Sequence, residues 1–264
     1  MPPVACSLRS MCDDTFMPDA SVSVVAHLPK TLILWDIDHT LIENGGVSKA
    51  TYALAFELLA GRAPSVRPVT DGRTDFQIMH ELLSANSVDT EKYVEITQFE
   101  GVLVEAMTRN APQLPRRGHI LPGVIEALTA LSAIPSIVQS VLTGNIASNA
   151  RVKLSVFNLD RWVDLDVGGY GSDDTIRSNL VNASRGKVLK KYGTVFDRSS
   201  TILIGDTPLD VKAAREGGAR IIAVATGIYS ASQLIEAGAD VVLESLADLN
   251  RFMTTLVDLR TDVT

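Results

Sequence analysis

The sequence predicts an α/β protein: a doubly wound parallel sheet with an all-helical insertion after the first strand. Two observations predict this fold. From residue 121 onward, short apolar runs alternate with segments whose apolar residues recur at helical spacing. Residues 48–117, by contrast, contain helical patterns and no convincing strand. Strands that alternate with helices imply right-handed crossovers, and therefore a Rossmann-like parallel sheet covered by helices on both faces.

The length and composition are those of a globular enzyme. The chain has 264 residues, more than one compact domain usually holds, so an insertion or a second domain is expected. Hydrophobic residues make up 46% and charged residues 21%, which supplies a sizeable core. The net charge of -7 argues against nucleic acid as a partner. No apolar run is long enough to span a bilayer, so no membrane partner is expected.

Residues 1–28 are predicted to form a flexible N-terminal tail. They are polar, contain proline, and lack the basic start and apolar stretch of a secretory signal. The chain's two cysteines, Cys6 and Cys12, both lie in this tail, and no Cys/His cluster with zinc spacing accompanies them. This cysteine usage predicts a reducing, cytoplasmic location.

The first element after the tail is a buried strand over residues 32–35, which ends at Asp36 and Asp38. Side chains alternate along a strand, so the two acids project towards the same side, about 6–7 Å apart along the backbone. Taken alone, the pair is also compatible with two solvated residues where a strand runs into a loop.

The helical insertion is predicted as a cap domain over residues 48–117, between core segments 29–47 and 118–264. Helices are expected over residues 48–60, 75–84 and 89–110. Ser48 is expected to cap the first helix and Gly61 to end it. The end of the block is marked by Pro112, Pro115 and Gly118.

The rest of the chain alternates between the two kinds of element. Strands are predicted over residues 136–142, 162–167, 201–204, 220–225 and 240–243. Helices are predicted over residues 123–132, 147–157, 181–192, 208–216, 232–237 and 246–258. Residues 168–171 do not follow a dinucleotide-binding fingerprint and are expected to form a loop.

Polar residues follow three of these strands. They are Asp36 with Asp38, the segment Thr143-Gly144-Asn145, and the segment 205–210, which contains Asp206 and Asp210. Ligands of open parallel sheets bind beyond the carboxyl ends of the strands, so all three groups are expected at one edge. Converging carboxylates repel one another unless a cation lies among them, and oxygen ligands favour Mg²⁺. In the second segment, a hydroxyl and a glycine precede the N-terminus of a helix, which is an arrangement suited to binding phosphate.

These three segments resemble the motifs of the haloacid dehalogenase (HAD) superfamily. The resemblance is to the phosphoglycolate phosphatase-like branch, which carries a helical cap of the C1 type, and it covers residues 30 to 258. The matching segments are Asp36-Ile37-Asp38-His39-Thr40, Leu142-Thr143-Gly144-Asn145 and Gly205-Asp206-Thr207-Pro208-Leu209-Asp210.

The resemblance implies roles for these residues. Asp36 would be the nucleophile that forms an aspartyl phosphate, and Asp38 the general acid and base. Thr143, with Gly144 and Asn145, would bind the phosphoryl oxygens.

Mg²⁺ would be the cofactor that the resemblance implies. The ion would be bound by the carboxylates of Asp36 and Asp206 and by the backbone carbonyl of Asp38. Asp210 would be a further ligand or would support the ligands.

The sequence departs from the family at the lysine between the second and third motifs. Arg177 stands at the expected place and can pair with a phosphate bidentately. Lys187 is the alternative, although it falls inside a helix, as Lys153 does, and both lysines are expected on solvated helix faces.

Two further residues are candidates for substrate binding. His39 stands where the family often has glycine, and it could contact substrate or only solvent. Arg73 lies between two predicted helices of the cap, where it could reach the substrate when the cap closes. Thr74 or Asp75 is expected to cap the helix that begins there.

The sequence therefore predicts a Mg²⁺-dependent phosphatase that acts on a small phosphorylated metabolite through an aspartyl-phosphate intermediate. The enzymatic alternatives are a sugar phosphomutase and a dehalogenase, but Asp38 argues against the latter, since a departing halide needs no proton donor. A phospho-acceptor or pseudoenzyme module is the non-enzymatic alternative, and the inserted cap argues against it. A monomer or a homodimer is expected, and the choice of substrate is left open.

Overall fold

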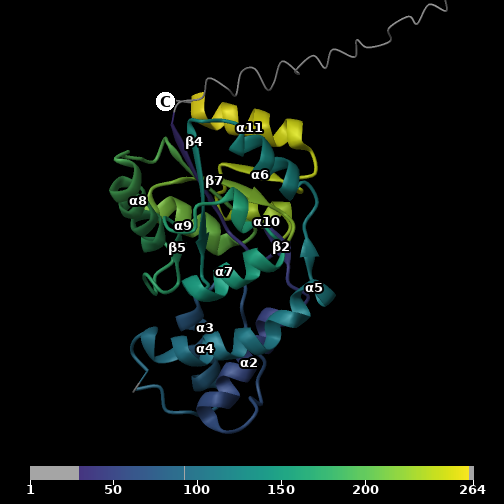
Figure 1. Ribbon diagram of the computed structural model, residues 1–264, viewed down its shortest axis with the longest axis vertical. Helices are drawn as coiled ribbons and strands as arrows, with labels where there is room; N and C mark the ends of the chain where they lie inside the picture. The colour runs from purple at the N-terminus through teal and green to yellow at the C-terminus, as the bar shows by residue number, and fades with distance from the viewer. Residues whose placement is uncertain (1–29, 92, 262–264) are drawn as a thin grey trace, which may run out of the picture.

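The computed structural model describes residues 30–91 and 93–261, and it confirms the predicted α/β fold (Figure 1). The predicted tail, with Cys6 and Cys12, lies outside the described residues. Within the described part, a six-stranded parallel sheet has the order β5-β4-β1-β6-β7-β8. The first strand therefore occupies the interior of the sheet, where the strand order reverses.

The strands of this sheet are short and buried, as the apolar runs predict. Their bounds are Thr31–Trp35 (β1), Ile137–Thr143 (β4), Gly169–Tyr170 (β5), Thr201–Gly205 (β6), Arg220–Val224 (β7) and Val241–Leu243 (β8). Strand β1 pairs in parallel with β4 on one side and with β6 on the other. The carboxyl ends of these three strands consequently lie side by side.

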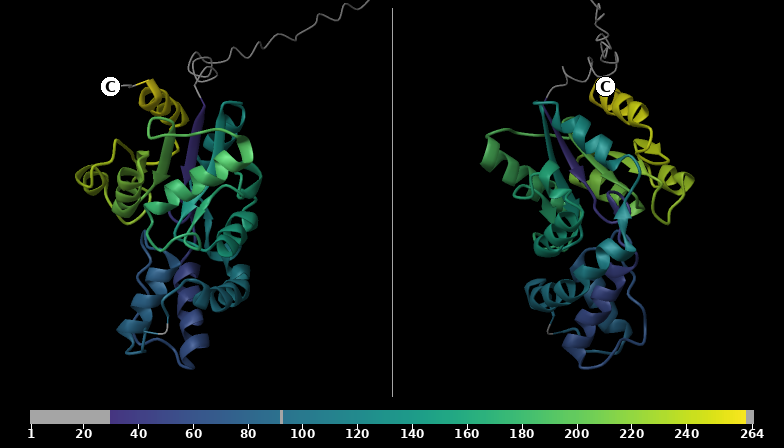
Figure 2. Two further views of the ribbon diagram at one scale, coloured as in Figure 1. Left: turned by 90° about the vertical axis from the view of Figure 1, so that its left-hand side faces the viewer. Right: turned by 45° about the vertical axis from the view of Figure 1, so that its right-hand side comes forward.

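Two layers of helices cover the sheet, because alternate side chains of β1 point to opposite faces. Ile33 and Trp35 belong to one apolar cluster, while Leu32 and Leu34 belong to another. Figure 2 shows helices on both sides of the sheet. Their bounds are Val124–Ser132 (α6), Ala147–Val156 (α7), Asn179–Tyr192 (α8), Pro208–Gly217 (α9), Ala231–Glu236 (α10) and Leu249–Thr261 (α11), with a 3-10 turn at Asp160–Trp162 (η2).

The insertion forms a helical layer beyond the carboxyl edge of the sheet, at the bottom of Figure 1. Its elements are Val47–Ala60 (α2), Asp75–Ala85 (α3), Thr97–Asn110 (α4), Ala111–Gln113 (η1) and Leu114–Arg117 (α5). Helices α2, α3 and α4 enclose an apolar cluster of their own. The exact cap-domain boundaries, 48 and 117, stay predictions.

Both connections between the helical layer and the sheet run through one small ribbon that the sequence analysis did not predict. Strands Ile42–Glu43 (β2) and His119–Ile120 (β3) pair antiparallel. Gly45, with φ of 60°, packs directly against the carbonyl of Arg117, where no Cβ would fit. Each strand is only two residues long, which is too short to give a periodic signal in the sequence.

The prediction of a strand over residues 162–167 is wrong. Strand β5 lies instead within residues 168–171, which were predicted to form a loop. Val163, Leu165 and Val167 are buried as the alternating pattern predicted, but they reach the core from an irregular segment. Strand β4 pairs instead with Gly169 and Tyr170. At Gly169 the carbonyl of Leu180 lies so close that only a glycine fits.

Two details of the helical layer also differ from the prediction. Helix α4 begins at Thr97 and not near residue 89, because the Gln98 side chain accepts hydrogen bonds from the backbone N–H groups of Val94 and Glu95. The N-cap of α2 is Gly46, so Ser48 is not the cap that the sequence predicted. Gly61 does end that helix, in the left-handed region.

Within the described residues, none of the helices combines the length and apolarity that crossing a bilayer requires.

Candidate active site

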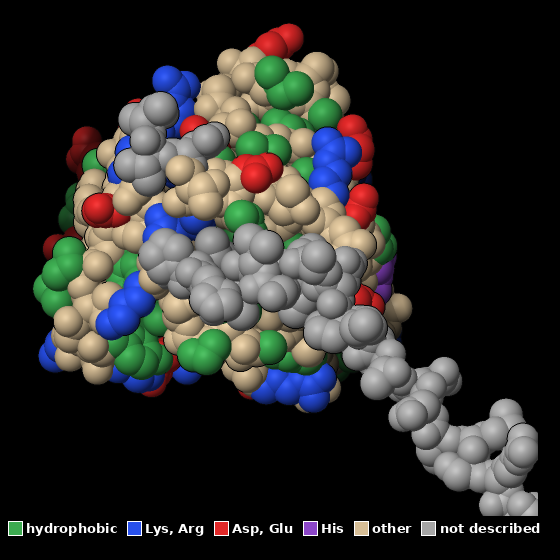
Figure 3. Space-filling model, turned by 90° about the horizontal axis from the view of Figure 1, so that it is seen from above, with side chains coloured by type: hydrophobic (Ala, Val, Ile, Leu, Met, Phe, Trp, Pro, Cys, Tyr) green, Lys and Arg blue, Asp and Glu red, His purple; other side chains and the backbone are tan. Residues whose placement is uncertain are grey.

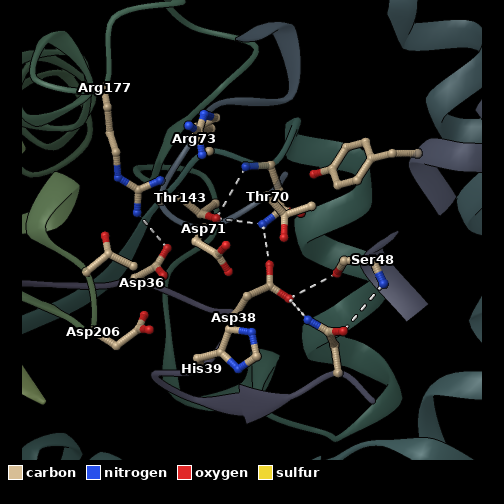
Figure 4. Close-up of a pocket in the computed structure, with 16 residues that line it drawn as sticks. Asp36, Asp38, His39, Ser48, Thr70, Asp71, Arg73, Thr143, Arg177 and Asp206 are labelled. Atoms are coloured by element: carbon tan, nitrogen blue, oxygen red, sulfur yellow. Dashed lines mark hydrogen bonds and ion pairs between the residues drawn. The ribbon is translucent and has the colours of Figure 1, made fainter. Parts of the chain in front are cut away.

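The three polar strand ends meet in one cavity of about 40 Å³ between the sheet and the helical layer (Figure 4). The predicted site residues that line it are Asp36, Asp38, His39, Arg73, Thr143, Gly144, Asn145, Arg177 and Asp206. Asp210 lies directly behind them. Parallel strands β4, β1 and β6 deliver these groups to the same edge, as the sequence predicts.

Asp36 contacts Arg177, the cation that the sequence predicts for the position between the second and third motifs. Arg177 Nη2 lies 2.8 Å from Asp36 Oδ1 and 2.5 Å from Asp210 Oδ1, and all three side chains are buried. Burial raises the pKa of Asp36 to about 7, although the Arg177 guanidinium opposes the shift. The arrangement leaves the second oxygen of Asp36 directed into the cavity (Figure 4).

Asp206 and Asp210 complete an acidic group with Asp36. One carboxylate oxygen from each of the three lies within 4.8 Å of the others. Asp210 is already engaged on both oxygens, because Oδ1 accepts from Arg177 and Oδ2 accepts from the N–H and hydroxyl of Thr207. Asp206 accepts only a 3.3 Å hydrogen bond from Thr40 among the described residues. Burial raises the pKa of Asp206 well above its usual range.

This donor set fits a Mg²⁺ ion. Asp36 and Asp206 offer free, buried carboxylate oxygens, which are the ligands that Mg²⁺ prefers, and a cation among them would favour their ionised forms. Asp210 fits the supporting role better than the ligand role, because it orients Thr207 at the start of α9 and balances Arg177.

Asp38 is held separately, by four donors. Asn44 Nδ2 (2.8 Å) and Ser48 Oγ (3.2 Å) donate to Oδ1, while Asn145 Nδ2 (3.0 Å) and Lys153 Nζ (2.6 Å) donate to Oδ2. Desolvation would raise the pKa of Asp38, but the Lys153 ammonium and these hydrogen bonds outweigh it and hold that pKa far below its usual range. Asp36 and Asp38 therefore sit in opposite electrostatic environments.

Lys153 is a site residue that sequence reasoning missed. It was expected on a solvated face of its helix, but its side chain is 1% exposed and also donates to Asn145 Oδ1 at 2.7 Å. A signal exists in the sequence: Lys153 lies on the same helical face as the buried Asn149 and Ala150. A charged residue on the apolar face of a helix needs a buried partner, and Asp38 is that partner.

Thr143 and Asn145 form a small network at the end of β4. The Thr143 hydroxyl oxygen accepts from Asn145 Nδ2 at 2.7 Å and from the Asn145 backbone N–H at 3.3 Å. Its own proton is thus available to an oxygen in the cavity. Asn145 is buried between Thr143, Asp38 and Lys153, so it orients these groups.

A loop of the helical layer, residues 70–75, closes the cavity against the sheet. Gly72 packs against Thr207 and Leu209, and the Arg73 carbonyl packs against Gly144 so closely that a side chain there would collide. Asp75 then donates its backbone N–H to the Gly144 carbonyl at 2.8 Å, and its Oδ2 accepts from the Ile146 N–H at 2.9 Å. The loop is thereby fixed on both sides of the acids.

Thr74 caps helix α3, as predicted, through a reciprocal pair of hydrogen bonds with Gln77. Arg73 lines the cavity, while its Nε lies 3.2 Å from Glu81 Oε2. The capping pair thus fixes the direction in which the helix leaves the closing loop.

His39 has a φ of 61°, the left-handed conformation that suits the glycine often found there, and its Nδ1 lies 2.9 Å from Glu43 Oε2. Lys187 does not reach the cavity, because its Nζ bonds Asp173 Oδ2 and the Gly168 carbonyl. Of the two cations weighed for the third motif, the geometry brings only Arg177 to Asp36.

Comparisons with known proteins identify the family of this chain. A family model described as haloacid dehalogenase-like hydrolase matches residues 33–215, and a second, for HAD-hydrolase-like proteins, matches residues 183–249. A protein named probable phosphatase IndB, from Dickeya dadantii (strain 3937), is 23% identical over 223 residues. That alignment covers 83% of this chain and 92% of the relative.

Solved structures share the fold. A hydrolase from Pseudomonas syringae has a TM-score of 0.60 at 20% identity, covering 86% of this chain and 98% of that one. A proposed β-phosphoglucomutase from Bacteroides vulgatus has a TM-score of 0.63 at 19% identity, with 92% and 97% covered. A predicted phosphoglycolate phosphatase from Haemophilus somnus has a TM-score of 0.60 at 16% identity, with 85% and 97% covered.

Proposed function

Since the chain belongs to the haloacid dehalogenase-like hydrolase family and is an enzyme of the HAD type, we propose that it is a Mg²⁺-dependent phosphatase acting on a small phosphorylated metabolite. One observation carries this proposal. Asp36 lies free on one oxygen and beside Arg177, while Asp38 is held apart by four donors of its own. Asp36 thus presents an unengaged oxygen to the cavity, as a nucleophile must, while Asp38 lies beside it in a fixed orientation, as a proton carrier must.

In the first step, one carboxylate oxygen of Asp36 attacks phosphorus, and the other oxygen would remain towards Arg177 and the Mg²⁺ site. The new O–P bond forms an aspartyl phosphate as the bond to the leaving alkoxide breaks. Arg177, the Thr143 hydroxyl and the backbone N–H groups near Gly144 receive the charge on the phosphoryl oxygens. Mg²⁺, held by Asp36, Asp206 and the backbone carbonyl of Asp38, would supply additional positive charge at this position.

Asp38 moves the protons. Because Lys153 holds the pKa of Asp38 low, the carboxylate must first take up a proton as the substrate binds. The protonated carboxyl then donates to the alkoxide as the ester bond breaks, and the carboxylate that results takes a proton from the water that attacks the aspartyl phosphate. The water oxygen forms the new bond to phosphorus, the bond to Asp36 breaks, and phosphate leaves. Lys153 and Asn145 fix the Asp38 carboxylate during this exchange.

The same site would serve a sugar phosphomutase, in which the aspartyl phosphate returns to a second hydroxyl of the sugar. The likeness to the Bacteroides vulgatus structure keeps this alternative open. Release of inorganic phosphate in proportion to alcohol favours the phosphatase, whereas an isomeric sugar phosphate without free phosphate favours the mutase. The proposal of a monomer or homodimer in the cytoplasm rests on the sequence alone.

Replacing the nucleophile tests the proposal. Asp36→Asn is expected to lower Mg²⁺-dependent release of phosphate from an aryl phosphate by at least about 1000-fold, because an amide oxygen does not attack phosphorus. The matched control is Asp258→Asn, an exposed carboxylate on α11 at the far end of the molecule (Figure 1). Undiminished turnover in a folded Asp36→Asn protein, checked by circular dichroism, would refute the assignment of the nucleophile.

A further inference from the structure

Asp71 lines the cavity, but the proposed reaction steps do not use it. It comes from the closing loop, and its carboxylate points into the centre of the group formed by Asp36, Asp38 and Thr143 (Figure 4). Among the described residues, Asp71 has no hydrogen-bond or ion-pair partner. A half-buried carboxylate without a partner, aimed into a cavity, is suited to receive a donor from a ligand.

The position of this carboxylate is fixed by its neighbours. Gly72, the next residue, packs against Thr207, and the Arg73 carbonyl packs against Gly144. The Arg73 backbone N–H also donates to the Thr70 carbonyl at 3.2 Å, which closes a tight turn around Asp71. Asp71 is therefore presented to the ligand before binding, so little ordering entropy opposes an interaction with it.

The helical layer also contributes Ser48, Tyr52 and Thr70 to the lining of the cavity. Tyr52 donates its hydroxyl proton to Asp75 Oδ1 at 2.5 Å, and Ser48 donates to Asp38. The Arg73 guanidinium, the only cation that the closing loop supplies among the described residues, is paired with Glu81. Of the two charged side chains that the closing loop brings to the cavity, Asp71 is therefore the one without a partner among the described residues.

The cations of the site already face other acids. Lys153 contacts Asp38, and Arg177 lies between Asp36 and Asp210. The two charges of the proposed Mg²⁺ would offset Asp206 and one of the acids beside Arg177, so none of these cations is left for Asp71. Asp71 remains as an uncompensated negative charge on the side where the alcohol leaves.

We propose that Asp71 selects phosphate monoesters whose leaving alcohol carries an ammonium group close to the ester oxygen. This inference rests on the proposed phosphatase function and names its substrate class: short amino-alcohol phosphates. The ammonium group donates to the Asp71 carboxylate, with the Tyr52 oxygen as a second acceptor. A carboxylate at the same place on the substrate meets repulsion from Asp71, so acidic esters such as phosphoglycolate are disfavoured.

Three esters of the same length test this inference. Phosphoethanolamine, 2-hydroxyethyl phosphate and phosphoglycolate all have a two-carbon alcohol part. The first two carry an amine or a hydroxyl on the second carbon, and in the third that carbon is a carboxylate. An aryl phosphate reports the basic reaction. We expect kcat/KM to be highest for the amine and lowest for the carboxylate, with about 10- to 100-fold between amine and hydroxyl, because a charged hydrogen bond is gained.

In Asp71→Asn, the ratio of kcat/KM between amine and hydroxyl is expected to fall towards one, and that between carboxylate and hydroxyl to rise. Asp258→Asn, the distant control, should keep both wild-type ratios. A wild-type preference for the hydroxyl or carboxylate ester overturns the inference, and so does an Asp71→Asn protein that retains the amine preference. Absence of phosphate release from every ester, the aryl phosphate included, refutes the phosphatase function itself, and the inference with it.

Discussion

The side chain of Lys153 fixes the direction of the Asp38 carboxylate. Its ammonium is buried, 2.6 Å from Asp38 Oδ2, and Asn145 braces both groups. A buried ion pair of this kind contributes less to stability than to geometry, because desolvation offsets much of the attraction. For a proton carrier, geometry is what matters: the carboxyl must face the ester oxygen when the bond to phosphorus breaks.

Removal of the Lys153 ammonium is expected to lower kcat by an amount that depends on the leaving group of the substrate. Lys153→Met should lower kcat for an alkyl phosphate by about 10- to 100-fold but for a nitrophenyl phosphate much less, because a nitrophenolate leaves without a proton. The exposed Lys190 of α8 provides the control, Lys190→Met, which should behave as wild type. Equal losses on both substrates would show that Lys153 acts only on folding or on substrate binding.

A second test compares Arg177 with Lys187, the other cation considered for the position beside Asp36. Arg177→Ala should lower kcat/KM by at least about 100-fold, since it removes the guanidinium that contacts Asp36 and faces the phosphoryl site. Lys187→Ala should change it by less than about threefold, because Lys187 bonds Asp173 outside the cavity. The reverse order of effects, measured by steady-state kinetics, would move the role to Lys187.

Strand ends made several of the site residues predictable from sequence, whereas Arg177 was predicted from the resemblance to a family. Asp36, Thr143 and Asp206 follow apolar strands, and the rule for parallel sheets brings them together. Lys153 comes from within a helix, and its burial depends on how α7 packs against the end of β1, which is a tertiary property. Asp71 was missed for a similar reason: only the closed loop brings its carboxylate to the acids.

Between elements, the closest contact across the cavity is the one between the closing loop and the turn after β4. Gly144 lacks a side chain at the point where the Arg73 carbonyl meets it, and the hydrogen bond from Asp75 follows at once. The closed position of the loop therefore depends on contacts between the two backbones.

Gly144→Ala is expected to hold this loop open. The added methyl group collides with the Arg73 carbonyl, so kcat/KM should fall by about tenfold or more, and trypsin should cut after Arg73 faster than in wild type. Gly186→Ala in α8 is the control, since nothing lies near its Cβ; that variant should keep its activity and gain about 1 kcal/mol of stability. Unchanged tryptic cleavage and kinetics in Gly144→Ala would contradict the role of the contact.

Element types were largely predictable, while some boundaries were not. Periodicity placed helices α2, α3, α6 and α7 to within a few residues. It failed at residues 162–167, where alternating apolar residues are buried without forming a strand, and at 89–96, where the Gln98 side chain replaces a helical turn. In both places the backbone N–H and C=O groups find partners in a side chain or a neighbouring element. The local pattern of apolar residues in the sequence does not reveal such partners.

Over the whole molecule, Asp75 couples the helical layer to the sheet and makes stability depend on pH. Burial raises its pKa from the ordinary 3.8 to about 6, although hydrogen bonds from Tyr52 and the Ile146 N–H oppose the shift. The folded protein thus binds this proton more tightly than the unfolded chain does. Its contribution is largest below pH 4 and is lost as pH rises through 6.

The loss amounts to at most about 3 kcal/mol for this one group. We expect the free energy of unfolding, measured by urea denaturation, to fall less between pH 4 and pH 6.5 in Asp75→Asn than in wild type. Comparing the two proteins cancels the contributions of the other titrating groups. Parallel pH profiles would indicate that Asp75 is ionised in the folded protein throughout this range.

The ribbon of β2 and β3 has a consequence for how the chain could have acquired its helical layer. Because Glu43 pairs with His119, the two ends of the insertion lie on adjacent strands, at a distance that a short hairpin turn spans. A gene segment for about seventy residues could thus enter or leave an ancestral hairpin without disturbing the sheet. In protein engineering, the same geometry marks this ribbon as the place where one helical layer could be exchanged for another.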